Sequence, residues 1–270
     1  MVVQHNLSAM NTNRQMGVVT SALQKSTEKL SSGYKINRAG DDAAGLSISE
    51  KMRSLIRGLN KASDNAQDGI SLIQVAEGAL NETHSILQRM NELATQAAND
   101  TNTSVDRQSI KDEIEQLNEE LDRISTTTQF NKQDLLTGGF SGKLQVGALE
   151  GQTMDVKISL AVSAKGLNVS AVEVSTNAKA GAAMQSIQDA IESVSKQRSK
   201  LGAIQNRLEH TINNLDTNAE NTQAAESRIR DTDMADEMVQ YSKNNILSQA
   251  GQSMLAQANQ QTQGVLSLLG

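Results

Sequence analysis

The sequence contains no cysteine, no proline and no tryptophan in 270 residues, and only two phenylalanines and two tyrosines. Without cysteine the chain forms no disulfides or thiolate metal sites and has no cysteine nucleophile. Because proline interrupts helices, its absence permits long unbroken helices. Aromatic side chains bury the largest areas, so their scarcity, with 37% hydrophobic residues, argues against a thick globular core and favours thin helical bundles.

Several classes of function lack support in the sequence. A formal net charge of -6 without a dense Lys/Arg cluster argues against nucleic-acid binding. The N-terminus has no basic segment leading into an apolar run, and no run of about 18 apolar residues occurs, so we expect neither a cleaved signal peptide nor membrane insertion. Nucleophile-elbow and phosphate-loop motifs are missing, which argues against an enzyme and against cofactors. The three histidines, His5, His84 and His210, lack metal-ligand spacing, so we predict no metal site.

The residue pattern of the N-terminal half predicts three helices. A marginal amphipathic helix begins at Leu7, where apolar residues fit a weak seven-residue frame, namely Leu7, Met10, Leu23 and Leu30. Glycines and paired aspartates within 31–45 predict a linker. A second helix is expected from about Leu46 to Asn99, with Glu77 and His84 as polar interruptions of its apolar seam. A third follows with Ile110, Ile114, Leu117, Leu121 and Ile124, and the two are expected to form an antiparallel hairpin.

The region from about 130 to 175 has a different pattern. Alternating apolar and polar residues on both sides of Glu150 and Gly151 predict one β-hairpin, in the most exposed and variable part of the chain. The longest helix is then expected from about Ala182 to about Arg228, where Arg198 and Gln205 fill single seam positions.

A final helix is predicted after Arg230-Asp-Thr-Asp233, because Asp233 suits an N-cap; we prefer capping to a calcium loop for this acidic stretch. Its apolar residues are Met234, Met238, Tyr241, Leu255 and Ala258, with a terminal apolar run over 265–269. Both ends of the chain are polar, and isolated helices are marginal, so we expect both ends to be disordered until assembly.

The predicted fold class is therefore mainly α: a long α-helical coiled-coil bundle from the N- and C-terminal segments, with a small β-hairpin region. Heptads alone indicate only that helices pack together, in a monomer or in any coiled-coil scaffold. Amphipathic segments at both extreme ends favour a non-enzymatic filament subunit whose ends form one stem for self-assembly.

Motifs in both halves of the chain support a more specific interpretation. In the N-terminal half they are Leu30-Ser-Ser-Gly-Tyr-Lys-Ile-Asn37, Asp41-Asp-Ala-Ala-Gly-Leu46, Asn65-Ala-Gln-Asp-Gly-Ile-Ser71 and Glu77-Gly-Ala-Leu-Asn-Glu82. In the C-terminal half they are Leu201-Gly-Ala-Ile-Gln-Asn-Arg-Leu208, Glu226-Ser-Arg-Ile-Arg-Asp-Thr-Asp233, Gln249-Ala-Gly-Gln-Ser-Met-Leu-Ala-Gln-Ala-Asn-Gln260 and Val265-Leu-Ser-Leu-Leu269. On these motifs the chain resembles bacterial flagellin, with only about 161–180 lacking a clear resemblance.

The resemblance implies a short flagellin without the large outer variable domains. Residues 1–42 and 232–270 would form the inner tube of a filament used for swimming motility, while 43–180 and 181–231 would form the next layer. It also implies an extracellular flagellum, export through the flagellar type III apparatus without signal cleavage, an export chaperone at the C-terminal segment, and a filament cap with hook-associated proteins as partners. The residues expected to carry self-assembly are Leu7, Leu23, Leu30, Met238, Leu255, Leu266 and Leu269.

The segment Leu87-Gln-Arg-Met-Asn-Glu-Leu-Ala-Thr-Gln96 resembles the patch through which many flagellins bind Toll-like receptor 5. The resemblance places the receptor contacts on Arg89, Leu93 and Glu113, with Gln88 and Gln96 beside them. The alternative is that Arg89 is a solvated helix charge and Leu93 a core residue.

Two other functions compete. A hook–filament junction protein has related ends, but the match through the middle of the chain favours flagellin. A helical signalling scaffold would need a membrane anchor or a docking domain, and the sequence shows neither.

Overall fold

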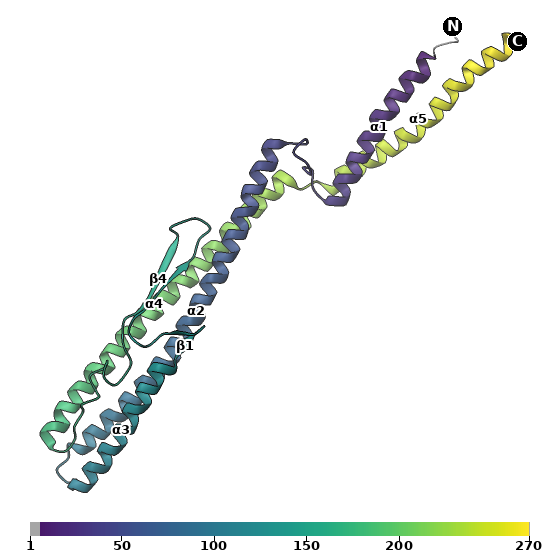
Figure 1. The fold of residues 1–270 in the computed structure, drawn as a ribbon. Coiled ribbons are helices and arrows are strands. Elements are labelled where there is room, and N and C mark those ends of the chain that lie inside the picture. Colours follow the sequence, from purple (N-terminus) through teal and green to yellow (C-terminus); the bar gives the residue numbers. More distant parts are fainter. Residues whose placement is uncertain (1–5, 270) are drawn as a thin grey trace. The chain divides into compact units, whose positions relative to one another are not determined.

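The computed structural model describes the backbone of residues 6–269 and the side chains of 6–261. Its helices are α1 Leu7–Ser32, α2 Ala43–Ala97, α3 Ser104–Thr127, α4 Asn177–Arg230 and α5 Met234–Leu269. The chain divides into two compact units, which we call the terminal unit (1–54 with 221–270) and the central unit (55–220). The predicted fold class, mainly α with a small β-hairpin region, is confirmed (Figure 1).

The central unit is a bundle in which α2 and α4 run antiparallel and α3 folds back along α2 (Figure 1). Every seventh residue of α2 from 59 to 94 is buried, namely Leu59, Ala66, Ile73, Leu80, Leu87 and Ala94. The same repeat buries Ile187, Val194, Leu201, Leu208 and Leu215 in α4. A sustained heptad keeps one side of each helix against its partner. The predicted coiled-coil packing and the α2–α3 hairpin are confirmed.

Polar interruptions of the seam pair with each other across the bundle. Glu77 of α2 and Arg198 of α4 form an ion pair of 3.7 Å. The fully packed polar position is the neighbouring Gln197, which is 4% exposed and donates from Nε2 to the Lys157 carbonyl at 3.3 Å. Arg198 was predicted to fill the seam, but it is only half-buried, and the buried position is one residue earlier, at Gln197. The shorter amide side chain fits there because it reaches a backbone acceptor inside the bundle.

The strands lie beside the helices of the central unit. Strands β3 Phe140–Gln145 and β4 Thr153–Ile158 form the predicted antiparallel hairpin, with Met154, Val156 and Ile158 buried. A second antiparallel pair, β1 Gln129–Phe130 and β2 Gln133–Asp134, was not predicted from the sequence. Its turn places Asn131 and Lys132 at positive φ without a glycine, so the usual hairpin signal is absent.

Two predictions about α4 are wrong. The helix begins at Asn177 instead of near Ala182, and with 54 residues it is one shorter than α2, which has 55. Ala180 and Ala183 are buried, so small residues carry the seam upstream of the first large aliphatic side chain. A pattern search based on large side chains therefore starts the helix too late.

The terminal unit consists mainly of α1 and α5, which lie antiparallel (Figure 1). Asn6 Nδ2 donates to the Ala258 carbonyl at 2.9 Å, and Lys29 pairs with Glu237 at 3.5 Å near the opposite end. The residues between these contacts that lie on the shared side are only half-buried, apart from Ser26. On α1 they are Thr12, Met16, Val19, Leu23, Ser26 and Leu30, and on α5 they are Tyr241, Asn244, Ser248, Gly251, Leu255 and Ala258.

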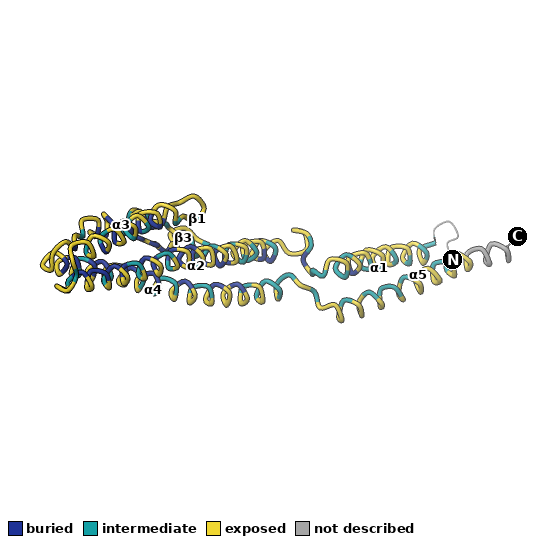
Figure 2. Tube along the Cα trace, turned by 90° about the horizontal axis from the view of Figure 1, so that it is seen from below, coloured by how far each residue is buried: buried dark blue, intermediate teal, exposed yellow. Residues whose placement is uncertain are grey.

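Burial is sparse in the terminal unit. Among its residues whose burial is described, only Ser26, Ile36, Gly45 and Ser49 are buried. Figure 2 shows the consequence as mostly yellow and teal traces along α1 and α5, whereas α2, α3 and α4 of the central unit carry rows of dark blue. Whether both ends are disordered before assembly stays a prediction, and the scarcity of buried apolar area is consistent with it.

Candidate assembly and recognition surfaces

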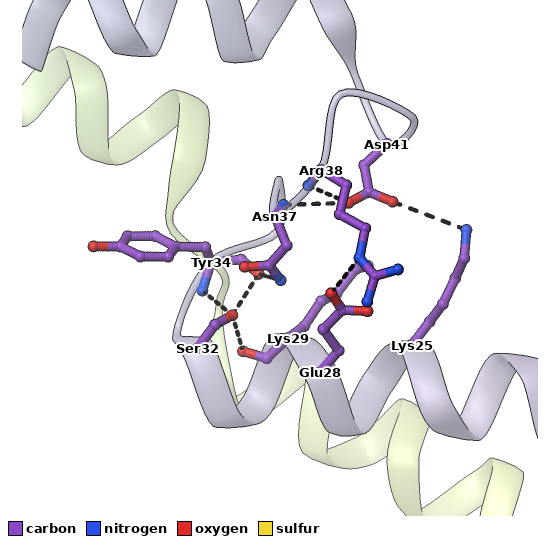
Figure 3. Close-up of polar contacts among 8 residues, drawn as sticks. All are labelled: Lys25, Glu28, Lys29, Ser32, Tyr34, Asn37, Arg38 and Asp41. Carbon is purple, nitrogen blue, oxygen red and sulfur yellow. Dashed lines mark hydrogen bonds and ion pairs between the residues drawn. The ribbon is translucent and has the colours of Figure 1, made fainter.

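The connection between α1 and α2 is a tight, hydrogen-bonded segment (Figure 3). Gly33 ends α1 in the left-handed conformation with φ +76, and its N–H donates to the Lys29 carbonyl. Asp41 Oδ2 accepts from the backbone N–H groups of Asn37 at 3.2 Å and Arg38 at 3.0 Å. One short carboxylate therefore closes the loop before α2 begins at Ala43.

Charges support the same segment. Arg38 Nε donates to Glu28 Oε1 at 2.9 Å, and Lys25 lies 4.0 Å from Asp41 (Figure 3). The backbone N–H groups of Arg38 and Asn37 lower the pKa of the Asp41 carboxyl below its ordinary value, and the Lys25 charge adds to this effect. Asp41 is therefore held in its ionised, hydrogen-bond-accepting form.

A second segment of the terminal unit is bonded to this connection. Lys35 N donates to the Arg230 carbonyl at 2.8 Å, and Thr232 N donates to the Gly33 carbonyl at 2.9 Å. The Arg230 guanidinium lies 4.6 Å from the centre of the Tyr34 ring, where it gains a cation–π interaction. These contacts form a clasp, defined here as residues 33–42 with 226–233, which holds the start of α5 beside the end of α1.

The clasp extends to the first turns of α2. Arg230 Nη1 donates to Glu50 Oε1 at 2.9 Å, and this hydrogen bond lowers the pKa of Glu50. Ser49 Oγ donates to Glu226 Oε1 at 2.7 Å. The break at 230–233 was predicted from the sequence, but the central position of Arg230 was not. Tyr34, near the other break, was the only signal in the sequence that pointed to it.

The sides of α5 and α1 that point away from each other carry exposed apolar residues. At about 3.6 residues per turn, Val239 and Ile246 lie on the side of α5 opposite its contact with α1, and they are 66% and 67% exposed. Val18, 61% exposed, lies on the corresponding side of α1. Further exposed apolar side chains lie at other positions around the two helices, with Met234, Leu247 and Met254 on the flanks of α5; they are Leu7, Met10, Met234, Met238, Leu247 and Met254. We call this set the outward apolar surface.

The predicted assembly residues fall on both sides of the two helices. Leu23, Leu30 and Leu255 are half-buried on the α1–α5 contact side. Leu7 and Met238 belong to the outward apolar surface, so the weak seven-residue frame that joined Leu7 to Leu23 is wrong. The side chains of Leu266 and Leu269 lie outside the described residues.

The predicted receptor residues lie where α2 and α3 pack against each other. Arg89 Nε donates to Glu113 Oε1 at 2.9 Å, and Arg89 Nη1 donates to Glu92 Oε2 at 3.2 Å. The Arg89 and Glu113 side chains are 51% and 44% exposed, and the hydrogen bond to Glu113, followed by that to Glu92, raises the pKa of Arg89. The structure therefore brings Arg89 and Glu113 together as an exposed charged pair.

The other three receptor residues are placed differently. Gln88 Nε2 lies 3.0 Å from His84 Nε2, and both Gln88 and Gln96 are exposed. Leu93 is 2% exposed and belongs to the core of the central unit. In the folded chain, a partner can therefore contact the polar residues of this set, whereas Leu93 packs in the core under the surface of α2.

Within the described residues, the structure contains no group of three or more metal-ligating side chains and no helix long and apolar enough to cross a membrane.

Comparison with known proteins agrees with the resemblance to bacterial flagellin found in the sequence. The family model "Bacterial flagellin N-terminal helical region" matches residues 3–141, and "Bacterial flagellin C-terminal helical region" matches 184–269. The chain belongs to the bacterial flagellin family. Flagellins are structural subunits of the flagellar filament, which confirms the predicted non-enzymatic class.

Relatives of this flagellin chain match over its whole length. It is 56% identical to the flagellin of Halalkalibacterium halodurans and 50% identical to the flagellar filament 31.3 kDa core protein of Treponema maltophilum, each over 100% of both chains. The crystal structure of Bacillus cereus flagellin matches with a TM-score of 0.51 and 34% identity, covering 60% of this chain and 94% of that one. The family models leave 142–183 unmatched, which includes 161–180, the stretch without a clear resemblance, and overlaps most of the predicted variable region of about 130–175.

Proposed function

We propose that this flagellin polymerises with copies of itself through the outward apolar surface, as the subunit of an extracellular flagellar filament used for swimming. The supporting observation is that α5 carries apolar residues on two opposite sides, of which α1 covers only one. A helix that is apolar on more than one side is normally buried on each of them.

The energetics favour a second partner for these helices. Burying a Val, Leu, Ile or Met side chain contributes about 1.5–3 kcal/mol relative to leaving it exposed. Nine such side chains are exposed on α1 and α5, whereas the described part of the terminal unit buries only Ile36 among its large apolar residues. Assembly would supply the apolar burial that the single chain lacks.

The same sparsity supports the proposed route to the filament. Residues 1–42 and 232–270 would form the inner tube, and 43–180 with 181–231 the layer around it. A terminal unit with little buried core unfolds at low cost, which suits export through the flagellar type III channel without signal cleavage, with a chaperone holding the C-terminal segment. A filament cap and hook-associated proteins would then receive the chain.

The test is seeded polymerisation followed by electron microscopy and light scattering. Val239→Ser with Ile246→Ser should abolish elongation, because both changes lie opposite the α1 contact and leave that contact intact. Deletion of 232–270 should also abolish it. Filaments formed by the double variant at the wild-type rate would contradict the proposal.

A matched control uses Val105, which is 72% exposed on α3 in the central unit. Val105→Ser removes a comparable exposed apolar side chain and should leave elongation much closer to that of the wild type. Circular dichroism of each variant establishes that helix content is retained.

A second proposed function is recognition by Toll-like receptor 5. The exposed Arg89–Glu113 pair, flanked by Gln88 and Gln96, offers a charged surface on adjacent helices. Arginine at the centre of an interface often dominates the binding energy. Leu93 would act here by fixing the position of Arg89 one turn earlier on α2, since it is buried in the free chain.

Arg89→Ala and Glu113→Ala should each weaken binding to the purified receptor ectodomain several-fold. The control is Arg123→Ala, because Arg123 pairs with Glu120 at a similarly exposed place on α3 outside the predicted patch. Equal affinities for wild type, Arg89→Ala and Glu113→Ala would contradict receptor recognition at this site without touching the filament proposal.

A further inference from the structure

Methionine is the main readily oxidised residue type in this chain. It has ten methionines, no cysteine and no tryptophan. Thiols and thioethers are the side chains that peroxide-class oxidants attack most readily, and exposure decides which members react first. In this protein the exposed thioethers are therefore the first targets.

The most exposed methionines belong to the outward apolar surface, at different positions around α1 and α5. Met10 is 64% exposed on α1, and Met234, Met238 and Met254 are 48%, 50% and 59% exposed on α5. In the central unit, by contrast, Met90 is fully buried, Met154 is 7% exposed and Met184 is half-buried. The oxidisable side chains thus lie on the surface that we assign to assembly, and the core is protected.

We propose that Met10, Met234, Met238 and Met254 are modification sites at which hydrogen peroxide blocks polymerisation of the free subunit. The inference rests on the proposed assembly function. With hydrogen peroxide, a sulfur lone pair attacks one peroxide oxygen, the S–O bond forms and the O–O bond breaks. The sulfide is oxidised to the sulfoxide, and the peroxide is reduced to water, which takes up the departing oxygen and the transferred proton.

The physical effect follows from polarity. A sulfoxide is a strong hydrogen-bond acceptor, and burying it without a donor is unfavourable. When an apolar surface gains four sulfoxide groups, burying it in a subunit interface becomes less favourable. Once subunits are assembled, the same thioethers are covered, so the filament is expected to resist a dose that inactivates the monomer.

The modification is reversible by an identifiable class of enzyme. Methionine sulfoxide reductases reduce the two sulfoxide epimers, one enzyme for each. Loss of elongation through these four residues should therefore be restored by treatment with both reductases, whereas loss through irreversible damage elsewhere should persist.

The experiment treats the full-length monomer with graded hydrogen peroxide, removes the oxidant, and measures elongation from untreated seeds beside mass-spectrometric site mapping. At the dose that oxidises the four exposed methionines but spares Met90 and Met154, the elongation rate should fall about tenfold. Reductase treatment should restore it. Wild-type elongation at that dose would overturn the inference.

The decisive variant replaces all four methionines by leucine, a change of similar volume that keeps the surface apolar. Treated with the same dose, it should keep most of its own untreated elongation rate. If it loses activity as the wild type does, oxidation elsewhere is responsible and the assignment is wrong. Failure of the untreated wild type to elongate would instead contradict the proposed function.

Discussion

At the residue scale, single side chains fix the clasp. Asp41 accepts two backbone hydrogen bonds from the loop before α2, and Arg230 joins the Tyr34 ring to the Glu50 carboxylate. Gly45 is equally constrained, because a Cβ there would lie 2.4 Å from Asp42 Oδ2 and 2.9 Å from Ile36 Cδ1. We expect these positions to tolerate little substitution, although Asp41 and Glu50 are exposed.

The Asp41 carboxylate makes the clasp sensitive to acid. Its pKa is lowered in the folded chain, so the native state binds fewer protons than the unfolded state just below the ordinary aspartate value. The stabilisation is therefore present above about pH 4 and is lost as the pH falls further. Native-state hydrogen exchange at the amides of Asn37 and Arg38 should show their protection factors falling in that range.

Two variants separate charge from hydrogen bonding at this position. Asp41→Asn keeps an acceptor oxygen but cannot titrate, so the protection of these amides should become nearly independent of pH. Asp41→Ala should lose the protection at every pH. The same acid-induced decrease in Asp41→Asn as in wild type would assign the effect to another carboxyl group.

Gly45→Ala should destabilise the start of α2 by about 1 kcal/mol, because the new methyl group displaces the Asp42 side chain that accepts from Gly45 N at 2.9 Å. Hydrogen exchange of the Leu46 to Ile48 amides measures this loss. Gly40 is the matched control, since nothing lies within 4 Å of its Cβ position; Gly40→Ala should be neutral or slightly stabilising. Equal effects of the two substitutions would contradict the steric account.

At the element scale, α4 and α5 use the same aliphatic residue types in different ways. In α4 a sustained heptad buries every member from Ile187 to Leu215 inside the central unit. In α5 the described apolar residues are spread around the helix, and its contact side contains Asn244, Ser248 and Gly251. A continuous heptad completes its packing within one chain, whereas the spread in α5 leaves apolar area for other partners.

Leu201→Ala should destabilise the central unit by about 2–5 kcal/mol, because Leu201 is fully buried and its truncation leaves a cavity between packed helices. Urea denaturation followed by circular dichroism measures the change in the free energy of unfolding. Val105→Ala, at an exposed position, should change it by less than about 0.5 kcal/mol. A loss at Leu201 no greater than that at Val105 would show that the heptad does not carry the stability of the bundle.

At the scale of the whole molecule, the two units differ in how much apolar area the single chain buries. The central unit has a continuous core drawn from three helices and the β3–β4 hairpin. The terminal unit is held mainly by the clasp and by the half-buried contact between α1 and α5. Local opening free energies follow buried apolar contacts, so the units should differ in stability.

In hydrogen-exchange measurements on the monomer, the protection factors of amides in the central-unit core should exceed those in α1 and α5 by roughly tenfold or more. In the polymer, protection of α1 and α5 should rise toward that of the core. This measurement also tests the expectation that the ends of the chain become ordered on assembly. Equal protection of both units in the monomer would contradict it.

Much of the architecture could be predicted from the pattern of residues. Regular spacing of Ile110, Ile114 and Leu121 indicated α3, and the polar stretch before Ser104 indicated its start, where Thr103 and Asp106 form a capping box. Asp233 was correctly interpreted as an N-cap, since its Oδ1 accepts from Ala235 N at 2.8 Å. The start of α4 was missed because alanines carry its first buried positions, and β1–β2 because its turn lacks glycine.

The sequence by itself determined the helical class, the breaks and the family, because these depend on local periodicity, capping residues and motifs along the chain. Only the tertiary structure decided which apolar residues of α1 and α5 cover each other and which face outward, since a weak pattern fits more than one side of a helix. It also decided that Arg230 closes the clasp, that Leu93 is buried while Arg89 and Glu113 pair at the surface, and that four methionines of α1 and α5 are exposed. Those outcomes depend on contacts between residues far apart in the chain, which no local spacing encodes.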